Sequence, residues 1–173
     1  LVAKMGMGFV HGDGNTRQCM ATAAVAYKQS FGFDAPPFTY HDAELSDLMI
    51  FVGSNPAIAH PVFWNRIKAR TDEHTIVIVD PRNSETAKEA SMHVQIAPKS
   101  DLRFFYGVTR ILIENDWIDH DFIAASTQGF EELKQHVMGL DLDELAAASG
   151  LPRSAMEDLA RRIHEAKAVT LWW

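Results

Sequence analysis

Two short apolar runs with a helix-forming stretch between them constrain the fold of this chain most. Residues 48–52 read LMIFV and residues 75–79 read TIVIV. Continuous runs of this kind, the second one β-branched, are typical of strands buried on both faces of a parallel sheet. Between them, residues 62–70 carry apolar side chains at helical spacing. The sequence therefore predicts one βαβ crossover here.

The rest of the chain continues this alternation of strands and helices. Further strands are expected over 92–96 and 169–173, and helices over 18–30, 41–47, 84–90, 101–115, 118–125, 130–137, 142–148 and 151–166. This pattern predicts an α/β fold, Rossmann-like and doubly wound, with a mostly parallel sheet and flanking helices. Residues 1–17 are glycine-rich without a sustained period, so we expect an irregular lead-in followed by an α/β domain over 18–173.

Composition excludes several classes of protein. With 173 residues, 47% of them hydrophobic, the chain can bury one core. A net charge of −7 and scattered basic residues argue against a nucleic-acid partner. No apolar run approaches the roughly 20 residues of a membrane span, and a single cysteine excludes an internal disulfide. Because the chain starts at Leu1 and ends in AVTLWW, we expect a fragment of a longer protein.

Glycine or polar residues follow three of the predicted strands. They read GSN at 53–55, DPR at 80–82 and PKSD at 98–101. In an open parallel sheet these ends share one edge, where ligands bind. An aspartate there can accept from ribose hydroxyls, and a neighbouring arginine can stack on a base or pair with phosphate. We therefore predict a nucleotide cleft. Two alternatives stay open, an ordinary strand-to-helix turn at 53–55 and Asp80 as a helix cap.

The dinucleotide fingerprint G-x-G-x-x-G is absent, which counts against an ordinary NAD site. Cys19 is expected in the first turn of the helix over 18–30, where the helix dipole and Arg17 would stabilise its thiolate. The alternative is a small buried hydrophobe. His41, His60 and His93 lack a partner at i, i+4 and are assigned no metal. No Ser-His-Asp or paired-carboxylate arrangement can be read from the sequence, so chemistry supplied by a cofactor is the more economical hypothesis.

Several of these stretches together resemble one family. The most specific piece is NTRQCM followed by an alanine-rich helix, AYK and DAPP; the others are VGSNPAIAHP, VIVDPRNSETA, APKSDL and AVTLWW. They resemble the molybdopterin-guanine-dinucleotide oxidoreductases of the DMSO reductase superfamily, and among them most the bacterial assimilatory nitrate reductases. The likeness covers nearly the whole chain.

The resemblance implies roles for particular residues. Cys19 would be the protein thiolate on molybdenum, with Arg17 and Met20 beside it; formate dehydrogenases of the family carry histidine where this chain has Met20. The guanosine half of one cofactor would be held by Gly53, Ser54, Asn55, Val79, Asp80, Arg82, Ser100 and Asp101. The family pattern has glycine where this chain has Lys99, which puts close backbone approach at that turn in doubt.

For the whole enzyme, the resemblance implies a molybdenum bis(molybdopterin guanine dinucleotide) cofactor and reduction of nitrate to nitrite. A [4Fe–4S] cluster held by a four-cysteine motif before Leu1 would pass electrons from a donor protein or reductase domain. The assimilatory likeness favours the cytoplasm, with the periplasm as the alternative. This chain would be the central domain, inactive by itself. Its rivals are a formate dehydrogenase-type molybdoenzyme domain and a non-redox nucleotide-binding module in which Cys19 is inert.

Overall fold

The computed structural model describes residues 2–12, 14 and 19–173, and the chain divides into two units, Leu1–Thr39 and Tyr40–Trp173. The first unit contains a π-helical segment, η1 (Val2–Gly6), and helix α2 (Ala21–Phe31). Neither contains a buried residue. The expectation of an irregular lead-in is therefore wrong for η1, while the domain boundary placed at residues 17 and 18 stays a prediction.

Helix α2 begins later than predicted. Met20 is its N-cap residue, and the helix ends at Gly32, whose φ of 80° is the left-handed conformation common after a helix. Cys19 therefore lies two residues before α2 and not in its first turn.

The second unit is built on a four-stranded parallel sheet. Its strands are β1 (Leu48–Val52), β2 (Thr75–Val79), β3 (Met92–Val94) and β4 (Val169–Trp172), in the order β3-β2-β1-β4. All three ladders are parallel; Leu48, for example, pairs with Thr75 on one side and Val169 on the other. The predicted α/β fold with a parallel sheet is confirmed. Strand β3 ends two residues earlier than expected.

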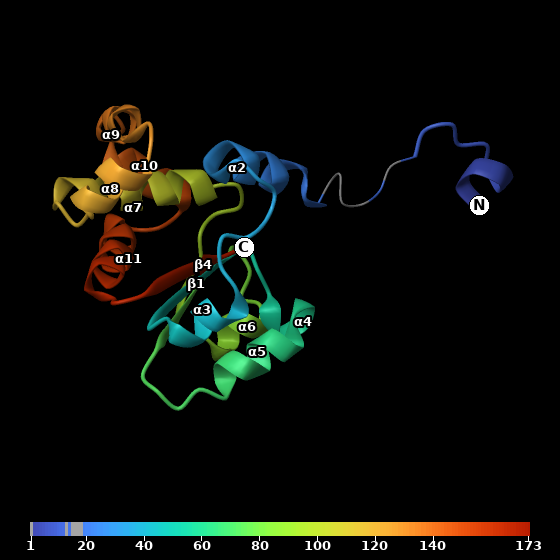
Figure 1. The fold of residues 1–173 in the computed structure, drawn as a ribbon, viewed down its shortest axis with the longest axis horizontal. Coiled ribbons are helices and arrows are strands. Elements are labelled where there is room, and N and C mark those ends of the chain that lie inside the picture. Colours follow the sequence, from blue (N-terminus) through green and yellow to red (C-terminus); the bar gives the residue numbers. More distant parts are fainter. Residues whose placement is uncertain (1, 13, 15–18) are drawn as a thin grey trace. The chain divides into compact units, whose positions relative to one another are not determined.

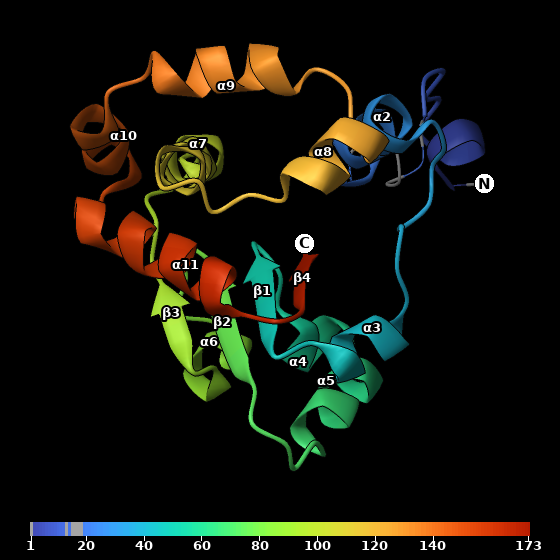
Figure 2. The ribbon, with the colours of Figure 1, turned by 60° about the vertical axis from the view of Figure 1, so that its left-hand side comes forward.

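Helices cover both faces of this sheet (Figure 1, Figure 2). The helices of this unit are α3 (Tyr40–Leu45), α4 (Pro56–Ala59), α5 (Pro61–Lys68), α6 (Glu85–Glu89), α7 (Asp101–Glu114), α8 (His120–Ser126), α9 (Phe130–Met138), α10 (Leu142–Ser149) and α11 (Arg153–Glu165). Alternate strand side chains, such as Ile50 and Val77, point into a core shared with α7, α10 and α11. The others, such as Phe51 and Ile78, pack against α3, α5 and α6.

Helices α7 and α11 pack closely because α7 has a glycine where they meet. A Cβ atom on Gly107 would lie 2.3 Å from Sδ of Met156, which is itself fully buried. At the end of α10, Gly150 adopts a φ of 71° and the preceding Ser149 carbonyl accepts from the N–H of Ala97 at 2.8 Å. The helical layer is thereby tied to the segment that follows β3.

Candidate functional site

The parallel sheet brings the three predicted strand ends to one side of the second unit. We call this the carboxyl edge, defined as residues 53–55 after β1, 80–82 after β2 and 97–101 after β3. Gly53 has a φ of 58°, a left-handed conformation that favours glycine. Its N–H donates to the Val79 carbonyl at 2.9 Å. No atom lies within 4 Å of the position that a Cβ would take, so a ligand can approach the backbone here.

Asn55 is committed to contacts within the protein. Its Nδ2 donates to the Glu85 carboxylate at 2.8 Å. Its Oδ1 accepts from the Thr86 backbone N–H at 3.2 Å and from the Thr86 hydroxyl at 2.6 Å. The hydroxyl oxygen in turn accepts from the N–H of Ala57 at 3.0 Å. The side chain therefore joins the start of α4 to the start of α6 and positions the turn that carries Gly53.

Asp80 shapes the next strand end. Its Oδ1 accepts from the Arg82 backbone N–H at 2.6 Å, and Nε2 of His93 donates to its carbonyl at 2.9 Å. Helix α6 is capped by Ser84, whose side chain accepts from the N–H of Ala87, so the alternative of Asp80 as the helix cap is wrong. The Oδ2 atom has no hydrogen-bond partner among the described residues, and the Arg82 side chain is exposed.

The third strand end is a tight turn. The Ser100 hydroxyl donates to the Ala97 carbonyl at 2.6 Å and does not cap α7. Lys99 adopts a φ of 67°, which is uncommon for a residue with a Cβ. This turn is therefore made with lysine where the family pattern has glycine. Asp101 is half-buried at the first position of α7, whereas Ser100 is buried.

Two further predicted residues lie at the same edge. Val79 is fully buried in the sheet, so only its backbone can face a ligand. Ser54 is half-buried and has no hydrogen bond within the described part of the chain. Of the eight predicted nucleotide-site residues, Gly53, Ser54, Asp80, Arg82 and Asp101 thus offer groups to a ligand, while the side chains of Asn55, Val79 and Ser100 serve the fold.

The predicted metal-site residues belong to the first unit. Cys19 and Met20 are both exposed, which contradicts the alternative of Cys19 as a small buried hydrophobe. Arg17 lies outside the described residues. Within residues 2–12, 14 and 19–173, no group of three or more histidine, cysteine, aspartate or glutamate side chains could hold a metal ion.

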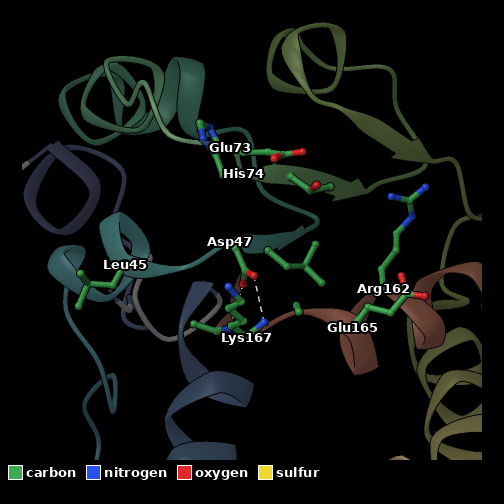
Figure 3. A pocket seen from close by; sticks show the side chains of 11 residues that line it. Leu45, Asp47, Glu73, His74, Arg162, Glu165 and Lys167 are labelled. Carbon is green, nitrogen blue, oxygen red and sulfur yellow. Dashed lines mark hydrogen bonds between the residues drawn. The ribbon is translucent and has the colours of Figure 1, made fainter.

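A pocket of about 570 Å³ lies at the opposite, amino edge of the strands (Figure 3). Asp47 lines it and accepts the N–H groups of Lys167 at 3.0 Å and Ala168 at 2.9 Å. Burial disfavours the charged carboxyl, but these backbone donors hold the pKa of Asp47 below its usual value of 3.8. Two of the lining charges are already neutralised, since Arg162 pairs with Asp158 and Glu165 with Arg161.

At this pocket, Asp47 therefore joins the start of β1 to the segment that leads into β4. Ligands of open parallel sheets bind beyond the carboxyl ends of the strands, which makes the carboxyl edge the candidate site. None of the helices in the part of the chain that the structure describes is long and apolar enough to cross a membrane.

Comparison with known proteins identifies the family. The family model described as molybdopterin oxidoreductase matches residues 2–155, which is most of the chain. The chain belongs to the molybdopterin oxidoreductase family. Membership implies a molybdenum–molybdopterin cofactor. The predicted family is confirmed, and the carboxyl edge fits a nucleotide-bearing cofactor because it offers backbone access at Gly53 beside free carboxylate and guanidinium groups.

Several curated relatives are named nitrate reductases. The chain is 35% identical to "Assimilatory nitrate reductase" of Haloferax mediterranei over 171 residues, covering 99% of this chain and 24% of that protein. It is 36% identical to "Nitrate reductase" of Klebsiella oxytoca over 170 residues, covering 96% and 19%. A formate dehydrogenase subunit of Methanococcus maripaludis is 30% identical over 154 residues, covering 88% and 23%. The chain thus spans about a quarter or less of the length of these relatives.

A solved structure shows the same fold. Acetylene hydratase from Pelobacter acetylenicus superposes with a TM-score of 0.77 over 91% of this chain and 22% of that protein, at 21% sequence identity.

Sequence reasoning missed the contacts of Asn55 with Glu85 and Thr86, because residues 30 positions apart give no local signal. It also missed Arg103, whose exposed place in the first turn of α7 puts it beside the carboxyl edge.

Proposed function

We propose that this molybdopterin oxidoreductase domain holds the guanosine half of a molybdopterin guanine dinucleotide at its carboxyl edge, as part of a nitrate reductase. Asp80 Oδ2 and the Asp101 carboxylate accept hydrogen bonds from the nucleotide, Gly53 allows its close approach, and Arg82 pairs with phosphate or stacks on the base. The observation that carries the proposal is that one parallel sheet edge gathers a left-handed glycine, two carboxylates and an exposed arginine.

For the metal, we propose that Cys19 supplies the thiolate ligand, with Arg17 and Met20 beside it. Its exposure leaves the sulfur accessible, and a soft thiolate suits a metal otherwise held by sulfur donors. When bound, molybdenum supplies the two-electron, oxygen-atom chemistry of nitrate reduction. The role of this chain is to bind and orient the cofactor. Nitrate as substrate is supported by the names of the relatives and by Met20, where the formate dehydrogenases carry histidine.

The complete enzyme would receive its electrons through a [4Fe–4S] cluster from a donor protein or reductase domain. Its compartment would be the cytoplasm, in keeping with the relatives named assimilatory nitrate reductase; a relative named periplasmic nitrate reductase supports the alternative. The isolated chain is expected to be inactive, because one thiolate and one nucleotide site do not replace the other contacts that a cofactor of this size requires.

The nucleotide half is tested with Asp80→Asn in this chain. Asparagine keeps an oxygen for the Arg82 N–H and so preserves the turn, but it replaces the free carboxylate oxygen with a donor. Losing one hydrogen bond to a charged carboxylate costs roughly 1.5–3 kcal/mol, so GDP should bind roughly ten- to hundredfold more weakly by calorimetry. Asp121→Asn on α8 is the matched control; Asp119 is less suitable because it caps α8. Equal losses in both variants would refute the assignment of this edge.

The metal half is tested with Cys19→Ser in the complete enzyme. Serine is a harder and far less acidic donor, so nitrate turnover should fall strongly while guanine nucleotide content stays unchanged. The same substitution in this chain should leave GDP affinity unaltered. Normal nitrate turnover by the serine enzyme would refute the ligand role of Cys19.

A further inference from the structure

Strand β3 and the two residues after it alternate between polar and buried apolar side chains. Val94 and Ile96 are buried in the core shared with α7, α10 and α11, whereas His93 is half-buried and Gln95 is exposed. Polar residues on a strand at the edge of a sheet are commonly a solvated surface that discourages pairing with another chain. Here, however, both polar side chains are hydrogen-bonded to the same short segment of the protein, which indicates a more specific role.

The segment that they contact is the turn from Asp80 to Arg82, at the end of β2. Nε2 of His93 donates to the Asp80 carbonyl at 2.9 Å, and Nε2 of Gln95 donates to the Pro81 carbonyl at 3.0 Å. Because a carbonyl oxygen can only accept, the imidazole carries its hydrogen on Nε2. Two consecutive carbonyls of the turn are thus held by side chains from β3 and the residue next to it.

The contact of Gln95 also determines how the Asp80 carboxylate lies. The Pro81 carbonyl and the Arg82 N–H belong to one peptide unit, which is trans, so the two groups point in opposite directions. Gln95 holds the carbonyl of this unit, and Asp80 Oδ1 accepts from its N–H at 2.6 Å. Holding the plane of this peptide therefore fixes the direction of the N–H to which Oδ1 is bound, and with it the orientation of the whole carboxylate.

The peptide unit between Asp80 and Pro81 is held in a similar way. Since proline has no N–H, the Asp80 carbonyl is the only hydrogen-bonding group of this unit, and His93 donates to it. The Asp80 N–H is bound as well, since it donates to the Val94 carbonyl at 3.2 Å. From the Asp80 N–H to the Arg82 N–H, every backbone polar group thus has a hydrogen bond within the chain itself.

We propose that His93 and Gln95 are positioning residues, which together form a clamp that holds the Asp80–Arg82 turn in its binding conformation before a ligand arrives. The inference rests on the proposed function and deepens it, because it assigns the order of this strand end to two side chains that act through the backbone. A group that is already ordered loses little conformational freedom when a ligand binds, so such order contributes to affinity. Removing either donor lets the turn adopt other conformations and lowers the affinity for GDP.

The test uses this chain, with GDP binding measured by calorimetry and the order of the turn measured by NMR. His93→Leu and Gln95→Met should each weaken GDP binding roughly three- to tenfold. Without ligand, hydrogen exchange at the Arg82 N–H should become faster in both variants. His93→Gln should restore GDP affinity to within about twofold of the parent, because its amide N–H reaches about as far as Nε2 of histidine and donates to the same carbonyl.

His74→Leu is the matched control. Nδ1 of His74 donates to the Asp72 carbonyl at 2.9 Å, so the substitution removes the same kind of hydrogen bond at the opposite, amino edge of the sheet. His74→Leu and His93→Leu should lose similar stability in urea, whereas only His93→Leu should lose GDP affinity. A comparable loss of GDP affinity in both would show a general effect of stability and refute the clamp.

The remaining outcomes separate this inference from the proposed function. If Asp80→Asn weakens GDP binding while His93→Leu and Gln95→Met leave it unchanged, the clamp is refuted and the proposed function stands. The clamp is also refuted if neither substitution changes hydrogen exchange at the Arg82 N–H, or if His93→Gln loses as much affinity as His93→Leu. If GDP does not bind the parent chain, the proposed nucleotide site fails and the positioning role fails with it.

Discussion

Replacing Asn55 with alanine should destabilise the domain even without a ligand. The substitution removes the oxygen that accepts the Thr86 N–H at 3.2 Å and the Thr86 hydroxyl at 2.6 Å. Thr86 is fully buried, so water cannot take over these contacts. It also removes the donor to the exposed Glu85 carboxylate, where solvent can compensate.

The magnitude follows from the burial of Thr86. A buried donor left without an acceptor costs about 1–3 kcal/mol. The hydroxyl can rotate toward another acceptor, whereas the backbone N–H cannot, so we expect about 1–3 kcal/mol for the pair together. For a chain of this size each kcal/mol lowers the melting temperature by roughly 2–4 °C. The expected shift is therefore roughly 2–12 °C.

Urea and thermal unfolding followed by circular dichroism measure this loss. Ser54→Ala is the control, since Ser54 is the neighbour of Asn55 and has no hydrogen bond among the described residues; its change should stay within about 0.5 kcal/mol. If Asn55→Ala unfolds at the same denaturant concentration as the parent, or if Ser54→Ala loses as much stability, then Asn55 does not join α4 to α6 in the way described.

Two further predictions concern packing and pH. Gly107→Ala places a Cβ 2.3 Å from Sδ of Met156. Overpacking costs about 1–3 kcal/mol and the better helix propensity of alanine offsets about 1 kcal/mol of it, so urea unfolding should show a free energy of unfolding lower by about 1 kcal/mol. A more stable variant would contradict the close packing of α7 on α11. The hydrogen bond from Arg70 lowers the pKa of Asp72 to about 2, so the stability that Asp72 contributes is complete above the usual pKa of 3.8 and is lost as pH falls through about 2. Asp72→Asn should therefore flatten the fall in the free energy of unfolding between pH 4 and 2. An unchanged dependence of this free energy on pH would contradict the ion pair.

The sequence predicted those parts of the fold that rest on local patterns. The runs of β1 and β2 lack the alternation of apolar and polar residues that half-exposed strands show, so they could be assigned as buried strands. Both strands match the structure residue for residue. Gly150 ends α10 as expected. The alternation of strands and helices predicted parallel strands, and parallel strands necessarily end at one edge of the sheet. The gathering of the three strand ends could therefore be predicted without knowing any contact between them.

Other features depend on contacts that no local pattern records. The short helix α4, which ends before His60, was not expected. The N–H of Ala57 in α4 donates to the hydroxyl of Thr86 in α6, a contact between residues 29 positions apart in the sequence. Asn55 stays a predicted nucleotide-site residue, but the hydrogen bonds of its side chain to Glu85 and Thr86 could not be predicted, because these residues lie about 30 positions away in the sequence. The start of α2 was predicted three residues too early, at residue 18, which put Cys19 in its first turn. The alanine-rich run gives no sharp start signal, because the N-cap residue of α2, Met20, makes no side-chain hydrogen bond.

The location of the nucleotide is the central claim, and mapping it by NMR on this chain tests that claim most directly. Titration with GDP should shift the backbone signals of Gly53, Arg82 and Lys99 first, and saturate them at one affinity. Signals from the amino-edge pocket, such as those of Glu73 and Lys167, should stay unchanged. Shifts that gather at Glu73 and Lys167 and leave Gly53 unaffected would contradict the assignment of the carboxyl edge as the cofactor site.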